Sequence, residues 1–382
     1  MGRLNRAALA NLRGVLQSHI DNARIPGAIA VVALGGHVEM FDSLGQQDAK
    51  AGTPMKDDAI FRIYSMTKPI VSLLALMLME EGRLQPGDPV SKYLPAFAGQ
   101  KVAVEGKGEV RLVAAVREPT VHDLLRHTAG LTYEFLGSSA VQRQYEEVDI
   151  TNRSRTNAEF CALLASLPLA HQPGSCYEYS RATDMLGALV EVVAGHPLGE
   201  LLRERILDPL GMKDTAFSVP KGHWPRIAEP FENDPDTGSP VTMMDAREVP
   251  RFESGGGGLV STAADYIRFL QLMRNRGMLE GTRLVSRKTI EWMTADHLGT
   301  IPINGELLLP GYGFGLGFAV RKDSGVAPQP GSPGQYFWSG IGGTSFLVDP
   351  AEDLFAMLLT QAPNQRIYFR NLFRHLVYAA ID

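Results

Sequence analysis

The chain has little cysteine and no strong excess of charge of either sign. Cys161 and Cys176 are the only cysteines among 382 residues, which excludes a disulfide-rich scaffold and argues against a zinc site built on cysteines. The formal net charge is −5 and no run of Lys or Arg stands out, so nothing indicates nucleic-acid or acidic-membrane binding. The nine histidines include no H-x-x-x-H pair, and we expect neither a metal nor another cofactor.

The N-terminal segment also lacks the features of a secretory signal. Charged and apolar residues mix at helical spacing up to about residue 22, without an uninterrupted apolar core or a small-residue cleavage site. We therefore expect a cytoplasmic protein. Hydrophobic residues make up 45% of the chain, enough for a sizeable core in two cooperating domains or one elaborated domain. The oligomeric state is left open.

Strand patterns lie at the two ends of the chain, and helical patterns dominate the middle. Two strand-like segments near the start are joined through Gly35 and Gly36, and both ends are predicted to contribute to one antiparallel sheet with helices on a face. The predicted strands are 27–34, 37–45, 345–350 and 353–361, with a small hairpin within 99–117. The predicted helices are 5–22, 120–127, 156–166, 181–195, 198–207, 262–276 and 365–380.

These patterns predict an α+β fold, an antiparallel sheet flanked by the N- and C-terminal helices with a mainly helical domain inserted. We expect residues 1–84 and 255–382 to form the sheet domain and residues 85–254 the helical one. The functional site is expected in the cleft between them, because domain interfaces are preferred places for small-molecule sites.

A serine and a lysine three residues apart, Ser65 and Lys68, precede a long apolar run. The spacing alone decides nothing, because Ser218 and Lys221 repeat it. Pro220 favours a turn at the second pair, whereas the first pair opens a predicted helix. Residues three apart share a face of a helix, so the Lys68 amine could reach the Ser65 hydroxyl.

The helix that follows is apolar on nearly every side over residues 70–80, which predicts burial all round. Unpaired N–H groups and the positive end of the helix dipole at its start would suit a developing oxyanion. The alternative is that Ser65 only caps a core helix and that Lys68 is solvated beyond it.

Six segments spread over the chain decide between these alternatives. In order and spacing they resemble the serine β-lactamase-like superfamily over most of the chain. Within it the sequence looks most like the carboxylesterases of class C β-lactamase fold, called family VIII, whose relatives include a lovastatin-type acyltransferase. The segments are YSMTKP (64–69), GRLQPGDPVSKYLPAF (82–97), TVHDLLRHTAGLTY (120–133), QPGSCYEYSRATDMLGALVE (172–191), GGGGLVSTAADYIRF (255–269) and FWSGIGGTSFLVDP (337–350).

The resemblance implies three catalytic residues: Ser65 as the acyl-accepting nucleophile, Lys68 as its helix partner and Tyr179 as the third member. Chemistry makes the same demand, because a serine hydroxyl is a poor nucleophile until a nearby base takes its proton. An amine or phenolate serves if its pKa is lowered toward roughly 7 to 8. We assign the base to the Lys68–Tyr179 pair without choosing between them.

Trp338, Ser339 and Gly340 occupy the place where β-lactamases and penicillin-binding proteins resemble one another in carrying Lys-Thr-Gly on an edge strand. We expect the triplet to bind substrate. An indole cannot offer the positive charge that a lysine offers to the carboxylate of a β-lactam, and a neutral ester would not need it. By the same analogy the backbone N–H groups of Ser65 and Ile341 would form an oxyanion hole.

Two further features stay outside the predicted catalytic set. Arg181 stands where β-lactamases carry an asparagine, and it could line the cleft, pair with a carboxylate such as Asp184, or begin the next helix as a solvated residue. The glycines at 255–258 are expected to let backbone pack closely beside the cleft, followed by a Thr262-x-x-Asp265 start that resembles a capping box.

The sequence therefore predicts a serine carboxylesterase that hydrolyses small, short-chain esters through an acyl-serine intermediate. Acyl transfer to another acceptor, or weak β-lactam or amide hydrolysis, is the enzymatic alternative. A non-catalytic binding member of the fold is the alternative from another class. The absence of a Gly-x-Ser-x-Gly motif excludes the nucleophile elbow of α/β-hydrolases.

Overall fold

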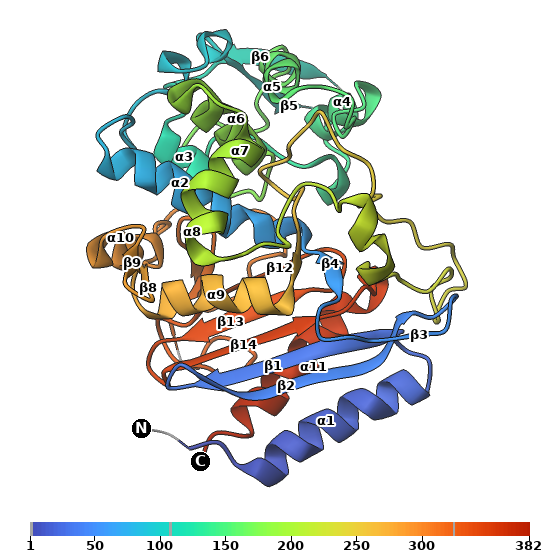
Figure 1. Cartoon of the computed structure of the whole chain (residues 1–382). Coiled ribbons are helices and arrows are strands. Elements are labelled where there is room, and N and C mark those ends of the chain that lie inside the picture. The colour runs from blue at the N-terminus through green and yellow to red at the C-terminus, as the bar shows by residue number, and fades with distance from the viewer. Residues whose placement is uncertain (1–2, 107–108, 324) are drawn as a thin grey trace.

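An eight-stranded antiparallel sheet forms the base of the molecule in a computed structural model that describes residues 3–106, 109–323 and 325–382 (Figure 1). The order of its strands is β10-β11-β12-β13-β14-β1-β2-β3, so strands from the two ends of the chain meet at its centre. The strands are β1 Gly27–Leu34, β2 His37–Asp48, β3 Thr53–Pro54, β10 Tyr312–Phe314, β11 Ala319–Arg321, β12 Tyr336–Ser339, β13 Ser345–Asp349 and β14 Leu354–Leu359.

Sequence pattern accounts for this pairing. The β1–β2 hairpin turns through Gly35 and Gly36, which both have positive φ (60° and 84°), a conformation that glycine adopts without a steric penalty. Every residue of β14 is buried, as is β1 apart from Leu34, so the central pair lies in the core. The predicted antiparallel sheet is confirmed, and β2 runs three residues further than predicted.

Helices cover both faces of the sheet. The N- and C-terminal helices α1 (Arg6–Asp21) and α11 (Arg366–Tyr378) pack together on one face, and α9 (Ala263–Arg274) lies on the other (Figure 1). Thr262 caps α9 by accepting the Asp265 N–H at 3.2 Å. The other half of the predicted capping box does not form among the described residues, because the Asp265 carboxylate instead accepts hydrogen bonds from Thr215 and the Asp214 N–H, both at 2.8 Å.

Most of the remaining helices lie above the sheet in Figure 1, in the segment between α2 (Thr67–Glu80) and β7 (Val260–Thr262). The hairpin predicted within 99–117 forms there. We propose that residues 85–254 form a domain separate from the sheet part, as the sequence predicts. The elements are α3 Val121–Leu125, α4 Ala140–Glu147, α5 Asn157–Ala165, α6 Ala182–Ala194, α7 Leu198–Leu202, a π-helical turn Arg203–Leu207, α8 Asp208–Leu210, β5 Lys101–Glu105 and β6 Val110–Ala114.

Helix α2 (Thr67–Glu80) lies between these helices and the sheet part (Figure 1). All of its residues from Thr67 to Leu78 are buried, as the apolar pattern predicts. The short strand β4 (Ile60–Arg62) precedes it and pairs with β7, which joins the first part of the chain to the last. Apart from short 3₁₀ turns, the part of the chain that the structure describes also contains β8 Met278–Leu279, β9 Thr282–Arg283 and α10 Arg287–Met293.

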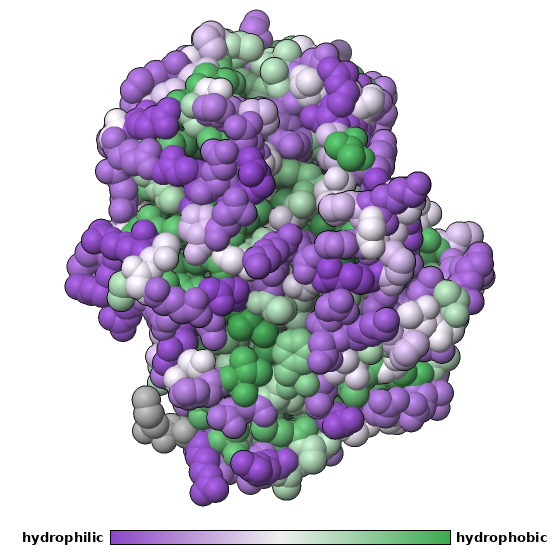
Figure 2. All heavy atoms as spheres, viewed as in Figure 1, coloured by the Kyte–Doolittle hydropathy of each residue, from purple (hydrophilic) through white to green (hydrophobic). Residues whose placement is uncertain are grey.

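Hydrophilic side chains dominate the face seen in Figure 2, with apolar residues showing in patches between them. In the part of the chain that the structure describes, no single helix has both the length and the apolar character to cross a membrane. One bent pair, Ala182–Ala194 with Leu198–Leu210, meets those two criteria together, and residues 182–190 of that pair are buried inside the protein.

Candidate active site

Ser65 lies in a single 3₁₀ turn, Tyr64–Met66, immediately before α2. The prediction that Ser65 opens the α-helix itself is wrong by two residues, because α2 begins at Thr67 with Met66 as its cap. Pro69 is the third residue of α2 and fits there, because N–H groups in the first turn have no partner within the helix.

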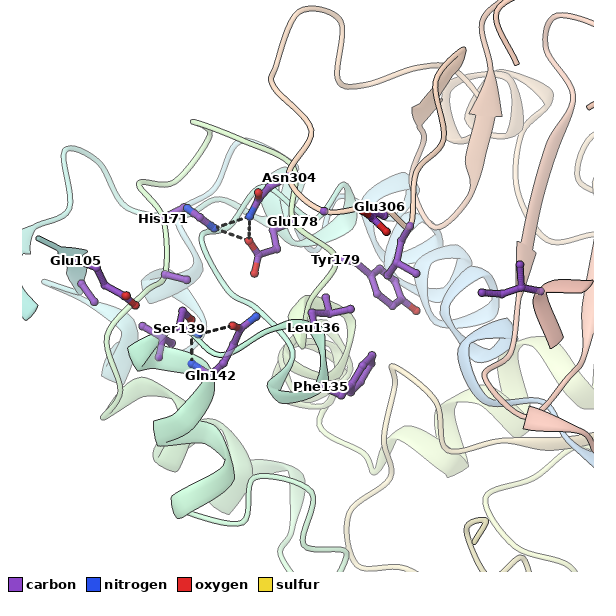
Figure 3. Close-up of a pocket in the computed structure, with 16 residues that line it drawn as sticks. Glu105, Phe135, Leu136, Ser139, Gln142, His171, Glu178, Tyr179, Asn304 and Glu306 are labelled. Atoms are coloured by element: carbon purple, nitrogen blue, oxygen red, sulfur yellow. Dashed lines mark hydrogen bonds and ion pairs between the residues drawn. The ribbon is translucent and has the colours of Figure 1, made fainter. Parts of the chain in front are cut away.

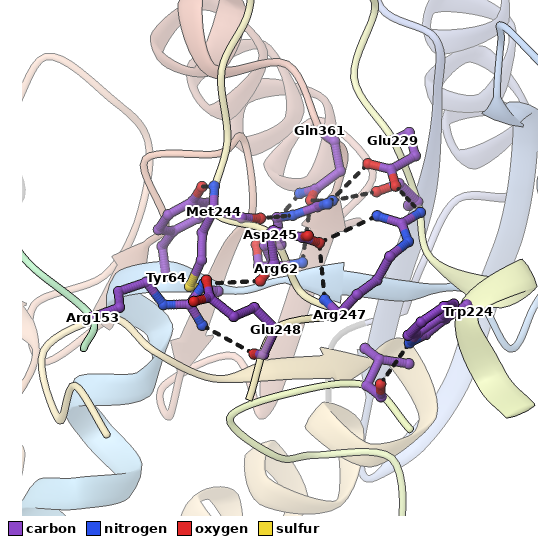
Figure 4. Close-up of polar contacts among 12 residues, drawn as sticks. Arg62, Tyr64, Arg153, Trp224, Glu229, Met244, Asp245, Arg247, Glu248 and Gln361 are labelled. Atoms are coloured by element: carbon purple, nitrogen blue, oxygen red, sulfur yellow. Dashed lines mark hydrogen bonds and ion pairs between the residues drawn. The ribbon is translucent and has the colours of Figure 1, made fainter. Parts of the chain in front are cut away.

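The residue before Ser65 is held in an unusual conformation. Tyr64 has a φ of 43°, which costs a non-glycine residue roughly 1–3 kcal/mol and persists only where surrounding contacts impose it. Its hydroxyl accepts a hydrogen bond from the Met244 N–H at 2.9 Å, and the Met244 carbonyl accepts one from buried Arg62 at 2.5 Å (Figure 4). Arg62 in turn pairs with Glu229 at 2.9 Å. This network fixes the turn that carries Ser65.

The amine of Lys68 is enclosed and makes three polar contacts. The residue is 0% exposed, so it is not the solvated lysine of the alternative interpretation. Its Nζ lies 3.4 Å from Ser65 Oγ, 2.9 Å from the Tyr133 hydroxyl and 2.6 Å from the Gly256 carbonyl oxygen. Burial lowers the pKa of Lys68 from its ordinary 10.5 to about 7. Two nearby charges have smaller effects: the Asp184 carboxylate raises this pKa, and the Arg181 guanidinium lowers it.

These contacts determine where the lone pair of a neutral Lys68 points. A neutral amine has two N–H donors and one lone pair. The Gly256 carbonyl can only accept, and burial raises the pKa of Tyr133 well above its ordinary value, so its oxygen stays a protonated phenol that can accept the second N–H. The lone pair is then left for the proton of Ser65.

Tyr179 completes the group on the other side of Lys68. The Lys68 Nζ lies 4.4 Å from the centre of the Tyr179 ring, and the Trp338 indole N–H donates to the Tyr179 hydroxyl at 3.3 Å. Burial raises the pKa of Tyr179 above its ordinary value of 10, and hydrogen bonds with Ser65 and Trp338 offset part of the rise. Tyr179 is therefore a neutral phenol beside the Ser65 hydroxyl, while Lys68 is the group that loses its proton near neutral pH.

His127 holds the backbone on both sides of Tyr179. Its carbonyl accepts the Glu178 N–H at 3.0 Å, and its ring Nδ1 accepts the Ser180 N–H at 3.2 Å. The ring lies 4.9 Å from the Tyr179 ring, and burial followed by the charge of Lys68 keeps the pKa of His127 well below its ordinary value. A neutral imidazole is required here, because only an unprotonated Nδ1 can accept.

Arg181 and Asp184 sit behind the Lys68 amine. The Arg181 guanidinium is buried and pairs with Glu134 at 2.5 Å and with Asp184 at 3.4 Å, so the solvated alternative for Arg181 is wrong. Asp184 also accepts the Gly256 N–H at 2.9 Å. A Cβ at Gly256 would lie 2.7 Å from Asp184 Oδ2, which explains a glycine at this point of the 255–258 loop. Asp184 thereby positions the residue whose carbonyl binds Lys68.

Strand β12 brings the Trp338 triplet to the same place. Trp338 contacts Tyr179 as described, and Gly340 passes so close to the Tyr64–Met66 turn that a Cβ would lie 2.5 Å from the carbonyl oxygen of Ile63, the residue before that turn. Ile341 follows, 39% exposed, and lines a cavity of about 250 Å³ together with Ser65. Ser65 and Ile341, predicted from distant segments, therefore line the same cavity.

A positive charge lies closer to this strand than the sequence suggests. Arg370 of α11 donates to Ser339 Oγ at 2.6 Å, next to the position where the lysine of Lys-Thr-Gly is replaced by Trp338. Burial, followed by the charges of Arg374 and Arg366, lowers the pKa of Arg370 to about 10. Within residues 3–106, 109–323 and 325–382, no carboxylate forms an ion pair with Arg370. A cation is therefore present beside this strand, although Trp338 itself carries no charge.

Three contributors to this site were not predicted: Tyr133, His127 and Arg370. Tyr133 and His127 belong to the quoted segment 120–133, whose aromatic and histidine residues were a usable signal. Nothing local marks Arg370, which reaches the site only because α11 packs across the sheet.

The comparison with known families agrees with this geometry. The family model described as Beta-lactamase matches residues 12–379. The chain belongs to the beta-lactamase family.

Relatives of the beta-lactamase family cover nearly the whole chain. Esterase EstB of Burkholderia gladioli is 34% identical over 385 residues, which is 94% of this chain and 91% of that protein. Among solved structures, EstCE1, described as a hydrolase with promiscuous acyltransferase activity, has 28% identity and a TM-score of 0.80 over 97% of this chain and 99% of that one. Simvastatin synthase LovD of Aspergillus terreus, as its LovD6 mutant, has 22% identity and a TM-score of 0.81 over 98% of this chain and 95% of that one, a likeness in fold. The predicted fold and family are confirmed, and the chain is a hydrolase of the serine β-lactamase fold.

Proposed function

We propose that the protein is a serine carboxylesterase of the family VIII type that cleaves esters of short-chain acids through an acyl-enzyme on Ser65. One observation carries the proposal: the fully buried Lys68 amine, with a pKa of about 7, lies 3.4 Å from Ser65 Oγ. An amine in that state is a general base at neutral pH. The descriptions of EstB as an esterase and of EstCE1 as a hydrolase support the choice of substrate class.

In this mechanism Lys68 Nζ takes the Ser65 proton as Oγ attacks the ester carbonyl carbon. The oxyanion that forms is stabilised by the backbone N–H groups of Ser65 and Ile341. When the carbon–oxygen bond to the alcohol breaks, Tyr179 gives its proton to the departing oxygen, and the Lys68 ammonium returns a proton to Tyr179. Water then attacks the acyl-enzyme, the Lys68–Tyr179 pair takes its proton, and Ser65 Oγ regains a proton as the acid leaves.

The substrate contacts come from the end of β12 and the residues that follow it. This strand pairs with both β11 and β13, so the expectation of an edge strand is wrong. Trp338 holds the Tyr179 hydroxyl, Gly340 allows the close approach of this segment to the Tyr64–Met66 turn, and Ser339 carries a hydroxyl that is bound by Arg370. Acyl transfer to another alcohol is the second candidate function. It needs only that an acceptor alcohol replaces water in the last step, and the description of EstCE1 favours it.

A non-catalytic binding role would not require a buried amine at Lys68, and burial of that amine costs free energy.

The test compares p-nitrophenyl acetate and a chromogenic cephalosporin as substrates for the wild type, Ser65→Ala and Lys68→Met. The proposal expects ester turnover in the wild type and none above background in either variant. Lys221→Met is the matched control, because it changes the lysine of the repeated Ser-x-x-Lys spacing and should leave activity unchanged. Faster cleavage of the cephalosporin would instead make the protein a β-lactamase. Equal activity in the wild type and Ser65→Ala would reject the mechanism.

A further inference from the structure

Two cavities of very different size lie beside the proposed catalytic residues. The smaller, about 250 Å³, contains Ser65 and Ile341. The larger, about 800 Å³, has Tyr179 in its wall. Phe135 lines both and stacks on Tyr133, with ring centres 4.8 Å apart, so it stands at the boundary between them. Ser65 of the smaller cavity hydrogen-bonds with Tyr179 of the larger one, so an ester carbonyl next to Ser65 lies close to both cavities.

The larger cavity has its own polar wall. Glu178 Oε2 lies 2.5 Å from the His171 ring and accepts from the Asn304 amide at 2.5 Å (Figure 3). Apolar residues such as Leu136 and Leu307 line other parts of it. In Figure 3 the Tyr179 hydroxyl points away from the His171–Glu178–Asn304 cluster. Tyr179 and the His171–Glu178–Asn304 cluster both line the cavity, so the cavity extends from Tyr179 to this cluster of hydrogen-bonding groups.

The chemistry of ester cleavage assigns one part of the substrate to each cavity. The leaving oxygen must lie against the group that protonates it, which is Tyr179, so the alcohol extends into the larger cavity. The acyl carbon is bonded to Ser65 Oγ with its oxygen toward the Ile341 N–H, so the acyl chain extends into the smaller one. This assignment rests on the proposed esterase function.

We propose that the natural substrate joins a small acyl group to a bulky alcohol, with the alcohol held in the larger cavity. A volume of about 800 Å³ lies within the range of roughly 300–1,000 Å³ that accommodates drug-sized ligands, and about 250 Å³ lies below it. The lining of the larger cavity includes three carboxylates, Glu105, Glu178 and Glu306, and among the described residues no lysine or arginine. Among those residues its one cation is His171, because hydrogen bonds with Cys176 and Glu178 raise the pKa of that imidazole to about 10. Carboxylates therefore outnumber cations, which disfavours an alcohol that carries an anionic group.

Two constitutional isomers test the assignment because they differ only in the direction of the ester. In 2-naphthylmethyl acetate the bulky group is on the alcohol, and in methyl 2-naphthylacetate it is on the acid. The wild type should hydrolyse the first with a kcat/KM at least about tenfold higher than the second. A carboxylate added to the naphthalene ring of the first should lower kcat/KM further. Equal rates for the two isomers, or the reverse preference, would overturn the assignment.

Two cavity-filling variants identify which cavity holds which group. Ala170 lines only the larger cavity and Thr151 only the smaller one. Ala170→Phe should lower kcat/KM for 2-naphthylmethyl acetate about tenfold or more and leave ethyl acetate within about twofold. Thr151→Phe should leave both acetates nearly unchanged and slow the corresponding butyrates. The opposite pattern would contradict the proposal.

A binding measurement keeps this test independent of catalysis. Calorimetry with the product alcohol, 2-naphthalenemethanol, should show binding to the wild type and to Ser65→Ala, weakened by Ala170→Phe and not by Thr151→Phe. If p-nitrophenyl acetate is hydrolysed but the alcohol does not bind, the esterase function stands and the cavity assignment fails. If no ester is hydrolysed but the alcohol binds as stated, the function fails and the assignment of the larger cavity stands.

Discussion

Replacing Lys68 by methionine should change how the stability of the protein depends on pH. The amine is 0% exposed, and burial lowers its pKa from 10.5 to about 7. The unfolded chain therefore binds more protons than the folded one between these two values. The contribution of Lys68 to the stability of the wild type must therefore rise with pH across that window, and Lys68→Met removes this contribution because a methionine side chain does not titrate.

The size of the effect follows from the two pKa values. Each pH unit in the window corresponds to about 1.4 kcal/mol. Between about pH 7, where the folded-state amine is half protonated, and about pH 9.5, the free energy of unfolding of the wild type should rise by roughly 3 kcal/mol relative to Lys68→Met. The substitution also removes the hydrogen bonds of the amine to Tyr133 and Gly256. Their removal shifts the difference between the two proteins by a constant and leaves its slope unchanged.

Urea unfolding of both proteins at several pH values measures this difference directly. The other titrating groups are common to the two proteins and cancel when one curve is subtracted from the other. A difference that stays flat from about pH 7 to about pH 9.5 would show that Lys68 is fully protonated at neutral pH. It would refute Lys68 as the general base.

Three further outcomes follow from the same geometry. Tyr133→Phe removes a partner of the Lys68 amine and should lower kcat about tenfold with little change in KM, measured by steady-state kinetics; an unchanged kcat would show that Tyr133 does not orient the amine. His127→Phe should lower kcat because the Ser180 N–H loses its acceptor, and His127→Asn, which offers a carbonyl oxygen, should restore part of it; equal losses would point to packing instead. The kcat/KM of the wild type should rise with pH through about 7 as Lys68 loses its proton. Asp184→Asn should move this rise in kcat/KM to lower pH, because the Asp184 carboxylate raises the pKa of Lys68. A shift of the rise to higher pH would contradict this.

The sequence predicted secondary structure and burial well where the pattern of apolar and turn residues lies within one segment. Two strand-like segments joined through Gly35 and Gly36 predicted the β1–β2 hairpin, and the mainly apolar run from 70 to 80 predicted a helix buried on all sides. The quoted segments also predicted which distant residues meet, and Ser65, Lys68, Tyr179 and Trp338 do lie together. Their catalytic roles stay a prediction that kinetics must test.

The features that could not be predicted depend on contacts between distant segments. The 3₁₀ turn at Ser65 and the positive φ of Tyr64 are imposed by the network of Arg62 and Met244, nearly two hundred residues apart in the chain. Arg370 becomes part of the site only through the packing of α11 against β12, and Arg181 is buried because Glu134 lies opposite. A local pattern carries no information on such partners.

Mass spectrometry of the protein quenched during turnover of p-nitrophenyl acetate is the direct test of an acyl-enzyme on Ser65. We expect an acetyl group on the peptide that contains Ser65 in the wild type, and none in Ser65→Ala. An acetyl group on a different residue during turnover, or hydrolysis without any covalent adduct under conditions where deacylation is slowed, would contradict the proposed role of Ser65.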